Sequence, residues 1–472
     1  MRTKPGRCWL RRFAAAVLGV AAAGAVAAAP PDDERIRQIL AGRIVQARHA
    51  TGMVVGIVTP AGRRIVGVGR LSADDPRAPD GKTLFEIGSV TKVFTSLLLA
   101  DMVRRGEVVL DAPVADLLPS QVSVPSREGR PIRLVDLATQ TSGLPNRPAN
   151  LKPRDFGNPH GDYGIDRLVA LLAAHALPQA PGERYEYSNA GVGLLGHALS
   201  QRARRSYPAL LRERITGPLG MADTDDNGVA APARAMAAGH SWALTPVDRW
   251  TSAELPASGF LRSNADDLLT FLEAFVGLRE SALAPAMKAM LETRRPGGIP
   301  PSRHIGLGWM LVPNDGGDIA WHPGRTGGYV SFVGFQAATR TGIVVLANAN
   351  TLNAVSDIGL HLLDPRQPLA DPKPPRLAPP MALDPADARP YIGRYEWLDG
   401  LDLQVVHEDG RLFLRAGSPR RFELFPDGDG TMVLREALGG RVHFDQGLDG
   451  QVRALNLWLW GHEYRAWRRA ER

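Results

Sequence analysis

The chain contains 472 residues, of which 44% are apolar and 22% are charged, a composition typical of globular proteins with a large buried core. The formal net charge is +7, but residues 1–29 hold five of the 56 basic residues and no acidic residue, which leaves 51 basic against 49 acidic residues, or +2. A balance so close to neutral gives no indication of a nucleic-acid partner, and we expect none.

Residues 1–29 have the pattern of a secretory signal peptide. Five Arg and Lys residues precede an alanine-rich apolar run over 13–26, and small residues at 27–29 provide cleavage options. We therefore expect a periplasmic or secreted protein without a stable membrane span once this segment is removed; the general and twin-arginine export routes both stay open. The single cysteine, Cys8, would leave with the segment, which excludes disulfides, thiolate metal sites and a cysteine nucleophile.

The predicted elements of residues 30–364 begin and end with strands. An amphipathic segment over 34–47 comes first, and Pro- and Gly-rich stretches separate most of the elements that follow. In chain order we predict strands at 53–59 and 64–69, helices at 90–105, 166–175, 190–203 and 265–276, strands at 306–312, 329–335 and 342–348, and a helix at 352–363. This order favours an α/β (α+β) domain with one sheet assembled from both ends around an inserted helical region.

Residues 365–390 contain nine prolines, which are poorly tolerated inside helices and sheets, and we predict a linker there. Short runs of alternating polarity follow, separated by Asp-Gly pairs. These runs cover 391–396, 401–407, 411–414, 422–425, 441–444 and 452–460. We expect residues 391–472 to form hairpins that close into a small all-β barrel or sandwich.

Two motifs indicate a nucleophilic serine. Ser89 and Lys92 lie three residues apart at the predicted start of a helix, so the amine can lie beside the hydroxyl on one helix face. Free backbone N–H groups of a first helical turn can stabilise negative charge on a carbonyl oxygen. Tyr187, in a Tyr-Ser-Asn sequence, is the candidate that shares proton transfer with Lys92, and Asn189 is placed to hold a substrate amide.

Further segments occur in a fixed order around these motifs. They are Phe-Glu-Ile-Gly at 85–88, Gln-Thr-Ser-Gly-Leu-Pro at 140–145, Pro-Leu-Gly-Met at 218–221, Pro-Ala-Ser-Gly-Phe at 256–260 and Asp-Asp-Leu at 266–268. With them the chain resembles the serine β-lactamase and penicillin-recognising D-Ala-D-Ala peptidase superfamily, on the class C side, over about residues 34–364. The resemblance implies a β-lactamase/transpeptidase-like fold, with an antiparallel sheet flanked by helices. Residues 391–472 resemble the lipocalin-like barrels appended to some family members.

The family's Lys-Thr-Gly motif can be matched in two ways, by His-Pro-Gly at 322–324 or by Arg-Thr-Gly at 325–327. Members have a Gly-aromatic pair four residues after the glycine of the motif. Gly-Tyr at 328–329 has this spacing only from Gly324, so His322 takes the place of the lysine.

The resemblance then implies roles for single residues. Ser89 is the acylated nucleophile, Lys92 its proton partner, Tyr187 the general base or proton relay and Asn189 a contact of the substrate amide. In the same register, the backbone N–H groups of Ser89 and Arg325 form the oxyanion pocket.

Other patterns are interpreted as structural. The Gly-x-Gly-x-x-Gly sequence at 191–196 follows no clear strand and is expected to serve helix packing rather than dinucleotide binding. The eleven histidines show no metal-ligand spacing, so we expect neither a metal nor a cofactor. His160 is expected on the surface or on a helix face, His240 in a structural role, and Trp458 and Trp460 in barrel packing.

The motifs favour an exported serine hydrolase that acts through an acyl-enzyme. The family resemblance implies that its substrates are β-lactams or the amides of D-Ala-D-Ala-type peptidoglycan peptides. Two alternatives stay open: an esterase or D-aminopeptidase, favoured by His322, and a protein that penicillin acylates and that turns over slowly. A histidine with an ordinary pKa of about 6.5 is partly charged near neutral pH, so we expect a pH dependence of activity that is due to His322. The sequence leaves the oligomeric state open.

Overall fold

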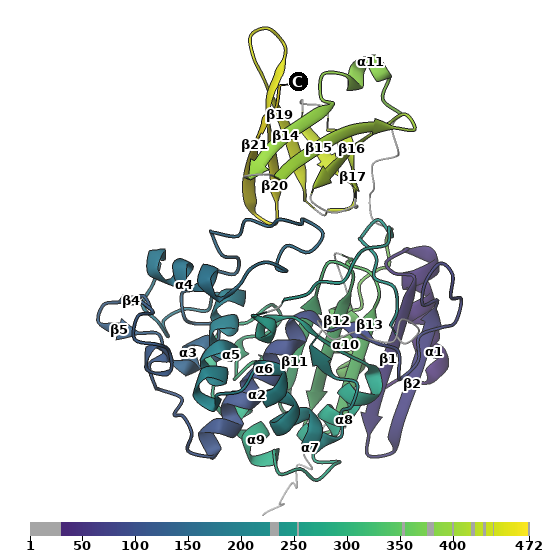
Figure 1. The fold of residues 1–472 in the computed structure, drawn as a ribbon. Coiled ribbons are helices and arrows are strands. Elements are labelled where there is room, and N and C mark those ends of the chain that lie inside the picture. Colours follow the sequence, from purple (N-terminus) through teal and green to yellow (C-terminus); the bar gives the residue numbers. More distant parts are fainter. Residues whose placement is uncertain are drawn as a thin grey trace, which may run out of the picture.

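The structure is a computed structural model that describes residues 30–226, 236–252, 254–351, 355–374, 382–398, 401–416, 421–427, 431–437 and 439–470. Two parts are visible: a body of helices and a sheet, and a barrel that lies over one end of the body (Figure 1). The expected signal peptide falls outside the described residues.

The body is built around an eight-stranded antiparallel sheet with the order β2-β1-β13-β12-β11-β10-β9-β8. The strands are β1 (Gly52–Thr59), β2 (Gly62–Gly69), β8 (Arg295–Pro296), β9 (His304–Ile305), β10 (Met310–Val312), β11 (Ile319–Arg325), β12 (Val330–Gln336) and β13 (Thr341–Ala347). β1 pairs with β13, from Met53 opposite Ala347 to Val58 opposite Gly342. The prediction of one sheet assembled from both ends of the domain is confirmed.

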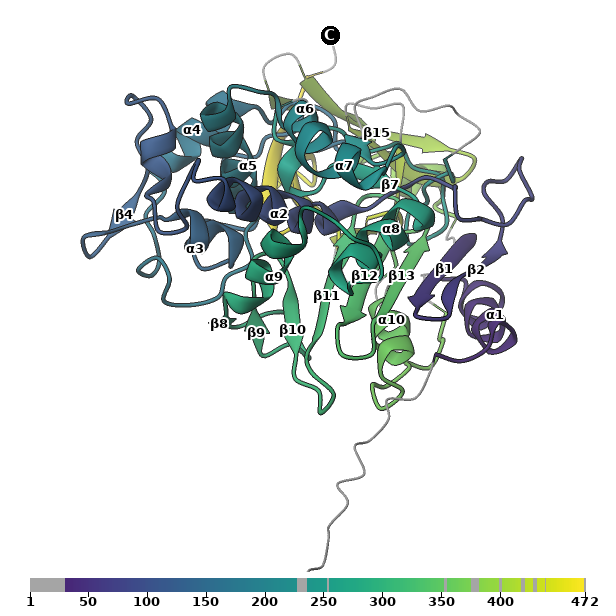
Figure 2. The same ribbon diagram turned by 90° about the horizontal axis from the view of Figure 1, so that it is seen from below.

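Helices cover both faces of this sheet (Figure 2). On one face lie α2 (Thr91–Arg104), α8 (Ala265–Phe275) and α9 (Ala284–Glu292), and on the other α1 (Asp33–Ala41) and α10 (Ser356–Leu363). Because side chains alternate along a strand, Val54 and Val58 of β1 enter the larger core, whereas Val55 and Ile57 pack with α1 and α10. The two-sided burial explains why β1 is an almost continuous apolar run.

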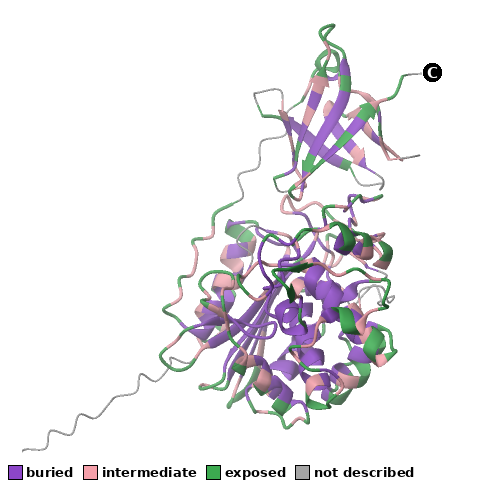
Figure 3. Ribbon diagram, turned by 90° about the vertical axis from the view of Figure 1, so that its left-hand side faces the viewer, coloured by how far each residue is buried: buried purple, intermediate pink, exposed green. Residues whose placement is uncertain are grey.

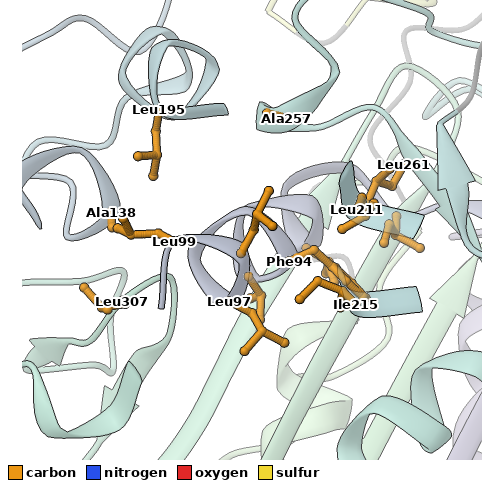
Figure 4. Packing of buried hydrophobic residues seen from close by; sticks show 14 of the residues in the cluster. Phe94, Leu97, Leu99, Ala138, Leu195, Leu211, Ile215, Ala257, Leu261 and Leu307 are labelled. Carbon is orange, nitrogen blue, oxygen red and sulfur yellow. The ribbon is translucent and has the colours of Figure 1, made fainter. Parts of the chain in front are cut away.

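Helix α2 passes through the middle of the body, and its residues from Thr91 to Met102 are all buried (Figure 3). Its side chains contact several surrounding elements, which supply the residues labelled around it in Figure 4: Ala138, Leu195, Leu211, Ile215, Ala257, Leu261 and Leu307. Most of these buried side chains are apolar, and such a helix is stable only when other elements enclose it. The start of α2 is therefore held firmly by packing.

The other elements of the body complete the inserted region and its borders. The helices are α3 (Leu134–Ala138), α4 (Ile165–Ala174), α5 (Asn189–Ala203), α6 (Tyr207–Leu211) and α7 (Gly217–Leu219). The 3-10 and π-helical turns are η1 (Gly42–Gln46), η2 (Gly88–Val90), η3 (Val114–Leu117), η4 (Arg212–Thr216) and η6 (Pro256–Ser258). The short strands are β3 (Phe85–Glu86), β4 (Ser126–Arg127), β5 (Arg130–Pro131), β6 (Asp225–Asp226) and β7 (Leu261–Ser263).

Some predicted boundaries differ from the structure. The strand expected at 306–312 is only β10, because Gly306 donates its N–H to the Trp309 carbonyl at 2.7 Å and Gly308 has a φ of +75°, which makes a turn. The amphipathic segment expected over 34–47 forms helix α1 as far as Ala41 and continues as the π-helical turn η1. Strand β11 was not among the predicted elements.

The C-terminal part is a closed eight-stranded barrel, as expected for an all-β domain. A short helix, α11 (Pro385–Ala388), precedes it. The strands are β14 (Gly393–Leu398), β15 (Leu401–Glu408), β16 (Arg411–Ala416), β17 (Arg421–Pro426), β18 (Thr431–Leu434), β19 (Arg441–Gln446), β20 (Val452–Leu459) and β21 (His462–Arg468). Pairing of β14 with β21 closes the barrel, which removes exposed sheet edges.

One aromatic residue of the body, Phe156, packs into the hydrophobic core of the barrel. Its side chain is 2% exposed, and its ring lies 5.1 Å from the ring of Tyr464 and 6.0 Å from that of Trp460. The backbone N–H of Phe156 also donates to the carbonyl of Ala416 at 3.3 Å. Barrel and body therefore share part of one core.

Candidate active site

Ser89 and Lys92 lie at the start of α2. Ser89 belongs to the turn η2 and Lys92 is the second residue of α2. Their three-residue spacing places both side chains on one face, with Lys92 Nζ 3.1 Å from Ser89 Oγ. Thr91 stabilises the turn by donating from Oγ1 to the carbonyl of Gly88 at 2.7 Å. The structure thus brings the predicted serine and lysine into contact.

Two glycines allow the turn that carries Ser89 to pack directly against β11. Gly88 has a φ of +51°, and a Cβ on it would lie 2.5 Å from the backbone nitrogen of Arg325. A Cβ on Gly324 would lie 1.9 Å from the carbonyl oxygen of Ile87. Any side chain at either position would separate the segments. The glycines therefore bring together the backbones of Ser89 and Arg325, from which we predicted the oxyanion pocket.

The Lys92 ammonium is buried, with 1% of the residue exposed. Its Nζ donates to Ser89 Oγ, to Asn189 Oδ1 at 2.6 Å and to the carbonyl of Ser258. Loss of water around the charge lowers the pKa of Lys92 to about 7. Near neutral pH, a large fraction of the molecules therefore carry a neutral amine that can accept the proton of the adjacent hydroxyl.

Tyr187 reaches Ser89 from the loop that precedes α5. Its phenol makes a hydrogen bond with Ser89, and Lys92 Nζ lies 4.9 Å from the centre of its ring. Burial raises the pKa of Tyr187 well above its ordinary value, so the phenol stays protonated. Of the two candidate bases, Lys92 is then the one that can take a proton in the free protein. A hydroxyl both donates and accepts, so Tyr187 can pass a proton on.

The loop around Tyr187 is fixed by two polar side chains. Ser188 is the N-cap of α5, and its Oγ accepts the N–H of Gly191 at 2.8 Å. Gln140 has a φ of +59° and accepts the backbone N–H of Ser188 on Oε1 at 2.6 Å. Gln140 also accepts the N–H of Glu186 on its carbonyl at 2.7 Å. Sequence reasoning gave Gln140 no role, yet it positions the Tyr187 loop.

Asn189 is the first residue of α5 and connects the lysine to the rim of the site. Its Oδ1 accepts from Lys92, and its Nδ2 donates to Asn146 Oδ1 at 2.8 Å. Asn189 therefore orients the lysine amine in addition to the substrate contact that we predicted. Asn146 was missed in the sequence, because it is a loop residue without a recognisable pattern.

His322 is buried behind the site, with 2% of the residue exposed. Its Nδ1 lies 2.7 Å from the carbonyl oxygen of Pro323, and its ring centre is 6.4 Å from that of Tyr187. Desolvation, together with the charge of Lys92, lowers the pKa of His322 to about 3. The expected titration of His322 near neutral pH is therefore wrong. The ring is neutral there and offers hydrogen bonding without charge.

Ser89, Tyr187 and Asn189 face a cleft of about 840 Å³. β10 pairs with β11 only over residues 319–321, and the following residues of β11 line the cleft. The polar and aromatic groups around it include Asn146, Arg147, His160, Trp250, Arg325, Asn350 and Trp460. Of the predicted site residues, Gly324 and Arg325 thus line the same cleft as Ser89.

Trp460 brings the barrel into the wall of this cleft. We predicted a packing role in the barrel for Trp460, and its ring does stack on Phe156. It follows β20 and has a φ of +53°, so its side chain leaves the alternation of the strand. The contribution to the cleft could not be found in the sequence, because it depends on how the barrel docks.

The environment of His240 agrees with its predicted role, whereas that of His160 does not. His240 is buried, with Nδ1 3.0 Å from the carbonyl oxygen of Asn348, which agrees with a structural role. His160 is half-buried rather than on the surface, with ring centres 5.6 Å from those of Trp250 and Phe260. It lies beside Ser89 because the loop before α4 folds back over the site.

Within the described residues, no three His, Cys, Asp or Glu side chains come together as metal ligands would. In the same part of the chain, every helix is too short or too polar to cross a lipid bilayer.

The body of the chain is similar to known proteins. The model of the Beta-lactamase family matches residues 33–363. The D-alanyl-D-alanine-carboxypeptidase/endopeptidase AmpH of Escherichia coli strain K12 is 26% identical over 328 residues, which cover 66% of this chain and 83% of that protein.

Two solved structures resemble different extents of the chain. A class C β-lactamase from Rhodobacter sphaeroides is 25% identical with a TM-score of 0.58, covering 69% of this chain and 97% of its own. The octameric penicillin-binding protein homologue from Pyrococcus abyssi is 21% identical with a TM-score of 0.60, covering 92% of this chain and 100% of its own. The second likeness concerns the fold alone, and its coverage extends beyond the body into the barrel.

Proposed function

The chain belongs to the β-lactamase family, and on this premise we propose that it is a serine hydrolase in which Ser89 becomes acylated. The proposed reaction is hydrolysis of the C–N amide bond of a β-lactam or of a D-Ala-D-Ala-type peptide. The contact that carries the proposal is the 3.1 Å approach of Lys92 Nζ to Ser89 Oγ, because a buried amine with a pKa of about 7 can activate a hydroxyl.

In the acylation step, Ser89 Oγ forms a bond to the carbonyl carbon while its proton moves to the neutral amine of Lys92. The negative charge that develops on the carbonyl oxygen is stabilised by the backbone N–H groups of Ser89 and Arg325. Lys92 gives the proton through the phenol of Tyr187 to the leaving nitrogen, and the C–N bond breaks. Tyr187 suits this relay because it contacts Ser89 and lies beside Lys92.

In the deacylation step, a water molecule replaces the leaving amine. The amine of Lys92 and the phenol of Tyr187 take the proton of this water, and the water oxygen bonds to the carbonyl carbon. Ser89 regains its hydroxyl proton as the acid is released. No group besides those at the site is needed to balance protons. Hydrolysis therefore regenerates the starting protein.

An esterase or D-aminopeptidase activity is the second candidate, and the neutral His322 favours it. The family's lysine at this position supplies a permanent cation, which a buried histidine with a pKa of about 3 cannot replace. Selection of a substrate carboxylate then depends on Arg147 and Arg325, whose guanidinium groups line the cleft. A protein that is acylated by penicillin and turns over slowly is the third candidate.

These candidates can be separated by intact-mass measurement after incubation with a penicillin, a D-Ala-D-Ala peptide and a short-chain ester. We expect Ser89-dependent adducts or products, and none with Ser89→Ala. An adduct without product supports the slow-turnover candidate. Absence of both with all three compounds contradicts the hydrolase proposal.

We further propose export to the periplasm or the medium, directed by residues 1–29.

A further inference from the structure

A second, smaller cavity has Ser89 in its wall. Its volume is about 80 Å³, whereas about 10–15 Å³ suffices for one water molecule, so it has room for a group of several carbon atoms. Its wall is mainly apolar. It includes Tyr163, Leu168, Ala190, Trp250, Leu255 and Phe260.

The wall of this cavity is rigidly held. Trp250 donates its backbone N–H to Glu86 Oε1 at 2.9 Å, and its ring packs edge-to-face with His160. His160 packs in the same way against Phe260. Leu168 belongs to α4 and is 1% exposed. The cavity is therefore formed before any ligand enters, which lowers the entropic cost of binding.

The charges around the cavity disfavour binding of a positively charged group. Burial lowers the pKa of His160 to about 4, and the positive charges of Arg147 and Lys92 contribute to this shift. His160 is thus neutral near pH 7. Ser252 contributes a neutral hydroxyl to the wall, and its Oγ accepts the N–H of Leu255 at 3.1 Å. A cation placed here would lose its water without gaining an acidic partner among the described lining residues.

The positions of the two cavities relative to the proton relay assign a direction to the substrate. Ser89 and Asn189 line both cavities, whereas Tyr187 lines the large cleft and is absent from the described wall of the small cavity. In the proposed reaction Tyr187 delivers a proton to the leaving group. The leaving group then occupies the large cleft, and the substituent on the other side of the scissile carbonyl faces the small cavity.

We propose that the small cavity is the acyl side-chain subsite and that it selects acyl donors with a compact, apolar acyl group that carries no positive charge. This inference rests on the proposed acyl-enzyme function and specifies its substrate class. Because Leu168, Leu255 and Phe260 lie in the wall of this small cavity, acyl groups longer than the cavity would collide with such side chains.

Esters with a common leaving group test the acyl side alone. We would measure kcat/KM for p-nitrophenyl acetate, butyrate, hexanoate and β-alanate with the full chain. Each methylene that enters an apolar pocket gains about fourfold, so butyrate, with two more methylenes, should exceed acetate by about 15-fold. In the β-alanyl group an ammonium replaces the terminal methyl of butyryl at nearly equal size, and we expect at least about 100-fold lower kcat/KM. Equal values for butyrate and β-alanate would overturn the assignment of the cavity.

A pair of substitutions on one helix tests the wall. Leu168 and Leu172 both lie on α4 and are both 1% exposed, but only Leu168 lines the cavity among the described residues. Leu168→Ala enlarges the cavity, so the ratio of kcat/KM for hexanoate over butyrate should rise about tenfold. Leu172→Ala should leave this ratio within about twofold, although both variants lose a similar buried volume. The same change of ratio in both variants would contradict the proposal, since it would reflect general loosening.

The two levels of the proposal fail in different ways. If no ester of the series gives product or adduct that depends on Ser89, the proposed hydrolase function fails. If hydrolysis depends on Ser89 but is insensitive to the acyl group and to Leu168→Ala, the function stands and the subsite assignment fails. The Ser89→Ala protein serves as the control for spontaneous ester hydrolysis in both cases.

Discussion

The guanidinium of Arg147 donates a hydrogen bond to the backbone carbonyl of Trp460. Arg147 follows Asn146, whose side chain holds Asn189 beside Lys92. A barrel residue is thus two contacts away from the residue that orients the lysine amine. The barrel therefore belongs to the surroundings of the site as well as to the stability of the chain.

Replacing Trp460 should change the selection of leaving groups. Trp460→Ala removes an aromatic wall of the large cleft, so kcat/KM for donors with a bulky leaving group should rise severalfold relative to donors with a small one. Trp467, which is 57% exposed on β21, gives the matched control Trp467→Ala. An unchanged ratio with Trp460→Ala, measured with two esters that share one acyl group, would show that the barrel has no part in selection.

Removing the Phe156 ring should weaken the union of barrel and body. Phe156→Ala deletes a ring that is 2% exposed and packs on three aromatic residues of the barrel, and we expect a loss of about 3–5 kcal/mol in the free energy of unfolding. Phe156→Leu retains most of the buried volume and should lose less than half of this. Denaturant titration measures both. Equal losses of unfolding free energy in the two variants would mean that Phe156 does not stabilise the protein by filling buried volume.

The pH profile of kcat/KM should rise toward alkaline pH. The proposed base is neutral Lys92, whose pKa is lowered to about 7, so activity should be low well below pH 7, half-maximal near pH 7 and level above it. His322 is already neutral over this range, because its pKa is about 3. His322→Gln should therefore leave the midpoint unchanged.

His322→Lys provides the opposite case. A second ammonium near Lys92 disfavours the charged form of Lys92, so its pKa and the midpoint of the profile should move to lower pH. A midpoint that stays near pH 7 in this variant would show that the group titrating in the pH profile is not Lys92. A midpoint that moves with His322→Gln would restore a titrating role for the histidine.

A side chain at Gly324 should disable the site. The Cβ of Gly324→Ala would overlap the carbonyl oxygen of Ile87 at 1.9 Å, so β11 and the turn of Ser89 must separate, and kcat should fall at least about 100-fold through loss of the oxyanion pocket. Gly42→Ala is the control, since a Cβ there would lie 3.7 Å from the nearest side-chain atom in an ordinary helical conformation. Circular dichroism and kcat measured on both variants distinguish misfolding from misplacement.

The predictions from sequence were strongest where a pattern is local. The spacing of Ser89 and Lys92, the N-terminal hairpin and the barrel follow from side-chain periodicity and turn residues, and the structure contains all three. The ordinary titration assumed for His322 was wrong because its pKa depends on burial by residues distant in sequence. Gln140 and Trp460 act through a backbone turn and through domain docking, and neither leaves a periodic signal.

The close contact between the turn at Gly88 and strand β11 also has a consequence for biosynthesis. Ser89 is translated early, but the strand that completes its site and the strand β13 that joins β1 follow more than 200 residues later. A growing chain therefore carries the serine, the lysine and the tyrosine before β11 can pack against the turn at Gly88. Chemical competence arises only when the last strands of the sheet are in place, so recovery of activity during refolding reports on completion of the whole body rather than on formation of α2.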